Sequence, residues 1–335
     1  MKSSKPKTSG YEKTIEAINS THDMPPQEAI DVLIACVKKG FSLASEKAVR
    51  TISKINHPTV IPSLIELYDW LEEDSRKRDN GCTVRMTIVE ALGDTSATMT
   101  IDTIRKAIRT VHVTKIGVSL EDTAVGLRAT AALALAKIDP DSLYELSLLL
   151  FDKKPDVPTS EPAYAKSSVR SAAARAIGFL RDTGGMPLLA VKLKFPDDEV
   201  PDVLAECLES LIFMRPPYLM EIVKPYLEGD DDYLSAIAAL SLAENLGSEV
   251  LDLLLETFAH VSKEAKEAIV VAISATRCDK ARQLLLDFLD HPDSFVRRGA
   301  VKGIKAYMDD EIKMKLQAIR DNDTDKYVRH EASLD

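Results

Sequence analysis

Residues 169–180 read VRSAAARAIGFL, and in this stretch Val169, Ala173 and Ile177 follow one another at intervals of four residues. The same spacing recurs in VRRGAVKGIKAY (296–307), LRATAALALAKI (127–138) and VRMTIVEALGDT (84–95). Positions i, i+4 and i+8 lie on one stripe of an α-helix. Each copy therefore predicts a helix that buries this stripe against its neighbours.

Less regular copies of the pattern extend over most of the chain. The copies start at positions 44, 84, 127, 169, 203, 234, 265, 296 and 328, so the spacings are 40, 43, 42, 34, 31, 31, 31 and 32 residues. A second amphipathic stretch lies between successive copies, for example at 58–71 and 281–291. A fixed period of two helices per unit is typical of helical solenoids.

Four of the copies open with a Val-Arg pair, at 84–85, 169–170, 296–297 and 328–329. This pair and the alanine and leucine spacing after it resemble the sequence pattern of the HEAT repeat family. The resemblance is to the short bacterial form, which also occurs in the phycobilisome-lyase HEAT-like proteins, and it covers about residues 26 to 335. It implies an all-α fold, an α-solenoid or α-α superhelix of about nine HEAT-like helical hairpins. It also implies that the second helix of each pair lies on the concave side.

This period also predicts the domain organisation. We expect a disordered tail over residues 1–10 and a single solenoid over residues 11–335. Its repeats should be long and irregular to about residue 182 and regular, at 31 residues, thereafter.

Composition indicates a soluble, reduced, cytoplasmic protein. The 335 residues carry a formal charge of -10, and no uncharged apolar run approaches the roughly 18 residues that span a bilayer. The first ten residues lack the apolar core of a signal peptide. The four cysteines are widely separated and form no CxxC pair. The acidic balance and the 5% aromatic content argue against nucleic-acid binding.

The three long spacings locate three insertions, at 72–83, 113–126 and 152–168. All three occupy the turn between the first and second helices of a unit, so we expect them to project side by side from one rim. Loops of this kind commonly carry binding residues, although long surface loops are also tolerated without a function. The candidate partner contacts in them are Arg76, Lys77, Arg78, Lys153, Lys154 and Tyr164.

The negative charge is concentrated between residues 195 and 260. Fifteen carboxylates against two cations give this segment a charge of -13. One interpretation is an acidic surface that docks a basic segment of another protein. The alternative is that these carboxylates cap helices at solvated turns. The candidate residues are Asp197, Asp198, Glu199, Asp230, Asp231 and Asp232.

Arginines open several of the second helices, for example Arg85, Arg128 and Arg297. They could bind phosphate. The HEAT resemblance instead implies a structural ladder, in which each guanidinium bridges to a turn aspartate of an adjacent unit.

No residue is nominated for catalysis, for a cofactor or for a metal. The HEAT-like enzyme deoxyhypusine hydroxylase binds two irons through several His-Glu pairs, whereas this chain has the single pair His330-Glu331. The helical-repeat DNA glycosylases use a basic groove, which the acidic second helix at 203–209 contradicts. The chain also lacks the common phosphate-loop and hydrolase motifs.

The predicted function is a non-catalytic scaffold that binds another protein through its concave surface and the rim of insertions. The alternative is a cofactor-handling lyase or chaperone of the bilin-lyase type. Neither nucleic acid nor a membrane is expected as a partner, and the oligomeric state stays open.

Overall fold

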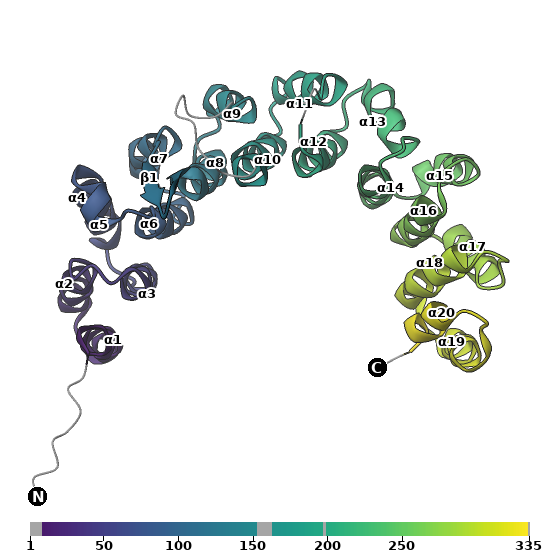
Figure 1. Ribbon diagram of the computed structural model, residues 1–335, viewed down its shortest axis with the longest axis horizontal. Coiled ribbons are helices and arrows are strands. Elements are labelled where there is room, and N and C mark those ends of the chain that lie inside the picture. The colour runs from purple at the N-terminus through teal and green to yellow at the C-terminus, as the bar shows by residue number, and fades with distance from the viewer. Residues whose placement is uncertain (1–8, 153–162, 197–198, 334–335) are drawn as a thin grey trace, which may run out of the picture. The chain divides into compact units, whose positions relative to one another are not determined.

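The computed structural model describes residues 9–152, 163–196 and 199–333, which form almost only helices (Figure 1). The chain divides into two compact units, Met1–Gly185 and Met186–Asp335. This boundary lies close to residue 182, where the repeat spacing in the sequence becomes regular. Each unit is described here by itself.

Among its described residues, unit 1 contains helical hairpins and a single pair of β-strands. Its elements are α1 (Gly10–Ser20), η1 (Thr21–Asp23), α2 (Pro26–Val37), α3 (Ser42–Ile52), α4 (Val60–Glu73), α5 (Ser75–Arg78), α6 (Thr83–Gly93), η2 (Thr98–Thr100), α7 (Ile101–Ile108), β1 (Val113–Ile116), β2 (Ser119–Asp122), α8 (Val125–Ile138), α9 (Leu143–Leu150) and α10 (Ala163–Leu180). The second helices α3, α6, α8 and α10 contact one another in that order and form one layer. The helices α2, α4, α7 and α9 form the other layer (Figure 1).

Unit 2 continues the same pattern without long insertions. Its elements are α11 (Gly185–Lys194), α12 (Pro201–Met214), α13 (Leu219–Leu227), α14 (Asp232–Leu246), η3 (Gly247–Val250), α15 (Leu251–Phe258), α16 (Lys263–Ala275), α17 (Asp279–Phe288), α18 (Ser294–Ile304), η4 (Lys305–Tyr307), α19 (Asp310–Asn322) and α20 (Lys326–Glu331). The second helices α12, α14, α16, α18 and α20 again contact one another in sequence, and we call them the inner layer of unit 2.

The stripe that defines the repeat is the core of both units. In each of the eight complete copies all three stripe positions are at most 4% exposed, and Val328 and Ala332 of the incomplete copy are equally buried. Small residues at the middle position, such as Ala173 and Ala300, let neighbouring second helices approach closely. The α-solenoid fold predicted from the sequence is confirmed.

The structure corrects the bounds of the third insertion and adds a pair of strands to the second. Helix α10 begins at Ala163, so the last six residues of the segment predicted as the third insertion, 163–168, are helical. The second insertion contains an antiparallel hairpin, in which Val113 pairs with Asp122 and Ile116 with Ser119. Gly117, at φ +62°, supplies the left-handed conformation that this two-residue turn needs.

Among the described residues, Asp232–Phe258 is the one stretch that is long and apolar enough to cross a membrane. Half of its most apolar window is buried inside the protein. The stretch also folds as α14, η3 and α15, with Gly247 at φ +61° between the two α-helices. It is therefore weak evidence for a membrane span, and it forms the second helix of one repeat unit and the first helix of the next.

A rim built on two buried ion pairs

The first insertion is held by a buried ion pair at the start of α6. The Nε of Arg85 donates to Oδ2 of Asp79 at 3.1 Å, and both side chains are 1% exposed. The Asp79 carboxylate also accepts the backbone N–H groups of Val84 and Arg85, each at 3.1 Å. Asp79 therefore satisfies the free amides of the helix start as well as the buried guanidinium.

Cys82 lies inside this arrangement but is not an activated thiol. Its Sγ is 3.0 Å from Nη2 of Arg85. Burial raises the pKa of Cys82, and the opposing effect of Arg85 does not cancel that rise. The thiol therefore stays protonated at neutral pH, which argues against nucleophilic catalysis by this residue.

The second insertion repeats the same chemistry one unit along the chain. Nη1 of Arg128 donates to Oδ2 of Asp122 at 2.7 Å and to the Thr110 carbonyl at 2.9 Å. Oδ1 of Asp122 accepts the backbone N–H groups of His112 and Ala124 at 3.1 Å. The Asp122 side chain is fully buried and that of Arg128 is 6% exposed. The base of the hairpin is thus held by a buried ion pair, because separating Asp122 from Arg128 would leave a buried charge without its counter-charge.

His112 and Asn80 join the two insertions. The Thr123 hydroxyl donates to the Asn80 carbonyl at 2.8 Å, and Nε2 of His112 lies 3.3 Å from Oδ1 of Asn80. Nδ1 of His112 lies 3.5 Å from Nη2 of Arg85, which can only donate. His112 therefore fits as the neutral tautomer that donates from Nε2. We call residues 79–82 together with 110–123 the rim, and the prediction that the first two insertions lie side by side is confirmed.

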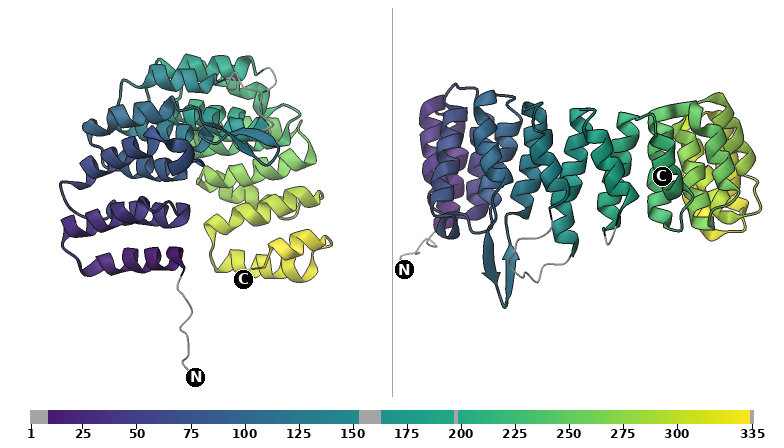
Figure 2. Two further views of the ribbon diagram at one scale, coloured as in Figure 1. Left: turned by 60° about the vertical axis from the view of Figure 1, so that its left-hand side comes forward. Right: turned by 90° about the horizontal axis from the view of Figure 1, so that it is seen from above.

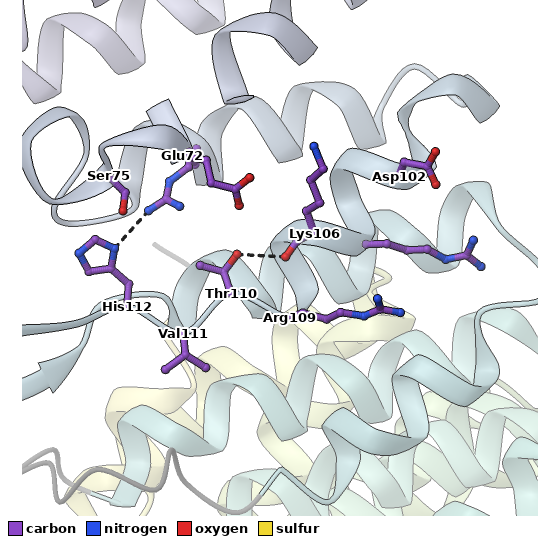
Figure 3. Close-up of a pocket in the computed structure, with 10 residues that line it drawn as sticks. Glu72, Ser75, Asp102, Lys106, Arg109, Thr110, Val111 and His112 are labelled. Carbon is purple, nitrogen blue, oxygen red and sulfur yellow. Dashed lines mark hydrogen bonds between the residues drawn. The ribbon is translucent and has the colours of Figure 1, made fainter. Parts of the chain in front are cut away.

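A pocket of about 770 Å³ opens beside the rim, between the end of α4 and α7 (Figure 3). It is polar and carries both signs of charge. Its lining residues are Glu72, Ser75, Arg85, Asp102, Arg105, Lys106, Arg109, Thr110, Val111 and His112. Three of its cations are engaged within the protein, because Arg85 pairs with Asp79 at 3.1 Å, Arg105 with Asp139 at 2.6 Å and Lys106 with Asp69 at 2.8 Å.

The three basic residues predicted in the first insertion have different environments. Arg78 lies against Trp70, with its guanidinium 4.3 Å from the ring centroid, and it donates to the Trp70 carbonyl. Lys77 is 82% exposed and lies 3.4 Å from the Asp74 carboxylate. Arg76 is exposed on the short helix α5. Arg78 is thus packed on the helix that precedes it, while Arg76 and Lys77 face solvent.

The residues predicted in the third insertion fall largely outside the described structure. Lys153 and Lys154 lie outside the described residues, as do Asp197 and Asp198 of the acidic set. Tyr164 belongs to the first turn of α10, and its side chain is not among those described.

The remaining acidic candidates divide between structural roles and solvent. The Glu199 carboxylate, 5% exposed, pairs with Lys192 at 2.5 Å. Asp231 is the N-cap of α14 and accepts the N–H groups of Tyr233 and Leu234, which confirms the helix-cap interpretation at this position. Asp232 accepts the Ser262 hydroxyl at 2.6 Å. Asp230 is exposed.

The arginine ladder predicted from the repeat is present with two kinds of partner. Arg297 binds Asp323 of the next unit through two hydrogen bonds, at 2.8 and 2.9 Å, as the HEAT resemblance implies. Arg85 and Arg128 take their main carboxylate from their own insertion instead. In these three cases a structural role accounts for the arginine.

Residues that sequence reasoning missed lie at the hairpin. Val118 at its tip is 98% exposed, Val111 is 57% exposed and Leu120 is 43% exposed. The hairpin projects beyond the ends of the unit 1 helices (Figure 2). The signal was available, because a glycine between short segments that are rich in Val, Ile, Thr and Leu is a pattern that predicts a hairpin.

Comparison with known proteins supports the repeat. Residues 251–334 match the model of the family described as HEAT repeats. This part of the chain consists of HEAT repeats. The finer resemblance to the phycobilisome-lyase branch stays a prediction.

The solved structures include a similar one, human deoxyhypusine hydroxylase in complex with glycerol. It shares 15% sequence identity with this chain at a TM-score of 0.33, over 84% of this chain and 96% of that one. No curated protein matches the sequence. Within the described ranges, no group of three or more His, Cys, Asp or Glu side chains is placed to hold a metal ion.

Proposed function

We propose that this HEAT-repeat protein is a non-catalytic cytoplasmic scaffold that binds another protein through the rim of unit 1. The observation that carries the proposal is an apolar tip on a rigid polar base. Val118 is 98% exposed, while Asp122 and Arg128 beneath it are almost fully buried. A two-stranded hairpin alone is marginal in water, so anchoring it with a buried ion pair gives it one fixed position.

The partner should be a protein with an apolar depression that accepts the hairpin tip. Val118 and Leu120 would supply the apolar contacts, which dominate the energy of protein interfaces when they become buried. Arg76 and Lys77 on α5 lie next to Asp79 along the chain and would add charged contacts at the edge. The pocket between α4 and α7 would accept positively or negatively charged side chains of the partner.

The proposal is tested by affinity capture from the native lysate with matched variants. Val118→Asp should abolish capture of a partner that the unaltered chain retains. Leu148→Asp is the control, because Leu148 is also exposed, at 57%, but lies on α9, outside the residues of the rim. If Val118→Asp retains the partner at the level of Leu148→Asp, the rim is not the binding surface. A change in the absorbance of added tetrapyrroles would favour the bilin-lyase alternative.

A further inference from the structure

The inner layer of unit 2 presents a second surface, which lies partly in the acidic segment predicted at 195–260 but consists of residues other than the named candidates. On α12 the solvent-accessible positions of this surface are spaced by 4, 3 and 4 residues, which places them on one face of the helix. They are Asp202, Glu206, Glu209 and Phe213. Adding the repeat period of 31 residues to each gives the equivalent positions on α14, which are Tyr233, Ile237, Leu240 and Glu244. A second addition gives Glu264, Ala268, Val271 and Ala275 on α16.

The apolar centre of this surface is the row of positions on α14, which is open to solvent. Tyr233 is 47% exposed and Leu240 is 36% exposed, and Phe213 on α12, at the position equivalent to Glu244, is 40% exposed. Ile237, between Tyr233 and Leu240 on the same face of α14, is half-buried. Helix α14 contacts both α12 and α16, so the three helices present their faces next to one another. Exposed apolar residues that cluster in this way mark interaction surfaces.

The margin of the surface is negative. Five of the twelve positions are carboxylates, at 202, 206, 209, 244 and 264, and none is a cation. The carboxylates of α12 lie against the apolar centre, since burial and the charges of Asp202 and Glu209 raise the pKa of Tyr233. On the helix beyond α16 the charged side chains on this side of the inner layer are positive. On α18, Arg298 and Lys302 occupy this side and pair with Glu267.

We propose that this acidic face, formed by the twelve positions on α12, α14 and α16, binds a basic amphipathic helix of a partner protein. The apolar stripe of such a helix would lie along α14, on Tyr233, Ile237 and Leu240. Its lysines and arginines would meet the carboxylates around them. Tyr233 and Glu244 are 11 residues apart on α14, or about 16 Å, which is the length of a helix of about 11 residues. This surface is distinct from the rim, so the two proposals stand or fall separately.

The test uses a fluorescent 15-residue peptide of leucine and lysine with helical amphipathic spacing. A peptide of the same composition in scrambled order is the control for charge alone. Fluorescence anisotropy with the full chain measures both affinities. We expect the amphipathic peptide to bind about tenfold more tightly than the scrambled one and to weaken as salt rises. Amide hydrogen exchange should slow on the exposed side of α12 and α14 when the amphipathic peptide is bound.

Two sets of variants locate the site. The triple variant Glu206→Gln, Glu209→Gln and Glu244→Gln should weaken binding about tenfold, and Leu240→Ser should do the same. The matched control removes the same charge elsewhere, with Glu249→Gln, Glu256→Gln and Asp290→Asn, and should change affinity less than about twofold. Circular dichroism confirms that each variant folds. Val118→Asp should leave peptide binding unchanged.

Several outcomes would overturn the proposal. Equal affinity for both peptides would reduce the surface to a diffuse charge effect. Equal weakening by the two triple variants would place the binding elsewhere. Failure of the peptide to bind, together with a shift of the sedimentation coefficient in the Leu240→Ser variant, would show instead that this face joins two copies of the chain.

Discussion

Arg85 and Asp79 form a buried ion pair, with 3.1 Å between Nε and Oδ2 and each side chain 1% exposed. A buried charge is tolerated in this way when an opposite charge is bound to it. The same relation recurs between Arg128 and Asp122, six residues apart as in the first pair. Both insertions therefore rest on one structural device, which fixes the rim relative to the second helices of unit 1.

Removing one partner of the pair should be costly. Asp79→Asn leaves the Arg85 guanidinium buried without its counter-charge, so we expect a loss of about 3–5 kcal/mol in the free energy of unfolding, measured by urea denaturation. The control is Asp69→Asn, because the pair of Asp69 with Lys106 is about half exposed on both sides and should be worth less than about 1 kcal/mol. Similar losses in the two variants would mean that the rim does not depend on the buried pair.

The rim should also respond to pH through His112. Burial and the neighbouring Arg85 guanidinium hold the pKa of His112 below its usual value of 6.5. The folded rim thus favours the neutral ring. This contribution to stability is complete above pH 6.5 and is lost as the pH falls through the lowered pKa. An NMR titration of the ring protons should give a midpoint below 6.5, and a midpoint at or above 6.5 would contradict the neutral hydrogen-bonded ring.

Much of the fold follows from the sequence because burial in a solenoid is periodic. Spacing alone predicts that Ala44, Val203 and Leu234 belong to the core, and each is at most 4% exposed. The spacing predicts the buried positions because every unit packs against its neighbours through equivalent residues. It also locates the insertions, since any residue beyond the period must lie outside the stack.

The chemistry of the insertions is harder to predict, because it depends on pairings across turns. The sequence predicts Glu199 at an acidic surface, but Lys192 from the preceding helix neutralises it in a nearly buried pair. From composition alone such a carboxylate is expected to be a surface charge. Which cation it pairs with depends on the path of the turn, which composition does not give. The sequence predicts an acidic surface at 195–260 but not the apolar neighbours of its carboxylates, since these carboxylates share a surface with Phe213 and Tyr233 only after the repeats are stacked.

Acid should destabilise the contact between α16 and α18. Burial alone would raise the pKa of Glu267, but hydrogen bonds from Arg298 and Lys302 hold it below 4.5. A carboxylate with a lowered pKa contributes stability that is present above pH 4.5 and is lost as the pH falls through the lowered value. Glu267→Gln should therefore lower the free energy of unfolding by about 1–3 kcal/mol at pH 7. The difference from the unaltered chain should shrink toward pH 3, and a pH-independent difference would exclude this role.

Gly299 provides a direct test of how closely the inner helices approach. In the interior of an exposed helix, replacing glycine by alanine adds about 1 kcal/mol of stability. At Gly299 of α18, however, a new Cβ would lie 2.7 Å from the Glu267 carbonyl oxygen and 3.1 Å from Cβ of Val270, both on α16. The first of these is a backbone atom, so relief requires the two helices to separate. Gly299→Ala should lower the free energy of unfolding by about 1–3 kcal/mol in urea denaturation.

Gly81→Ala is the control, since its Cβ would meet only Cγ2 of Thr83 at 3.5 Å. A gain in stability at Gly299 would mean that α16 and α18 are spaced more widely than the repeat requires.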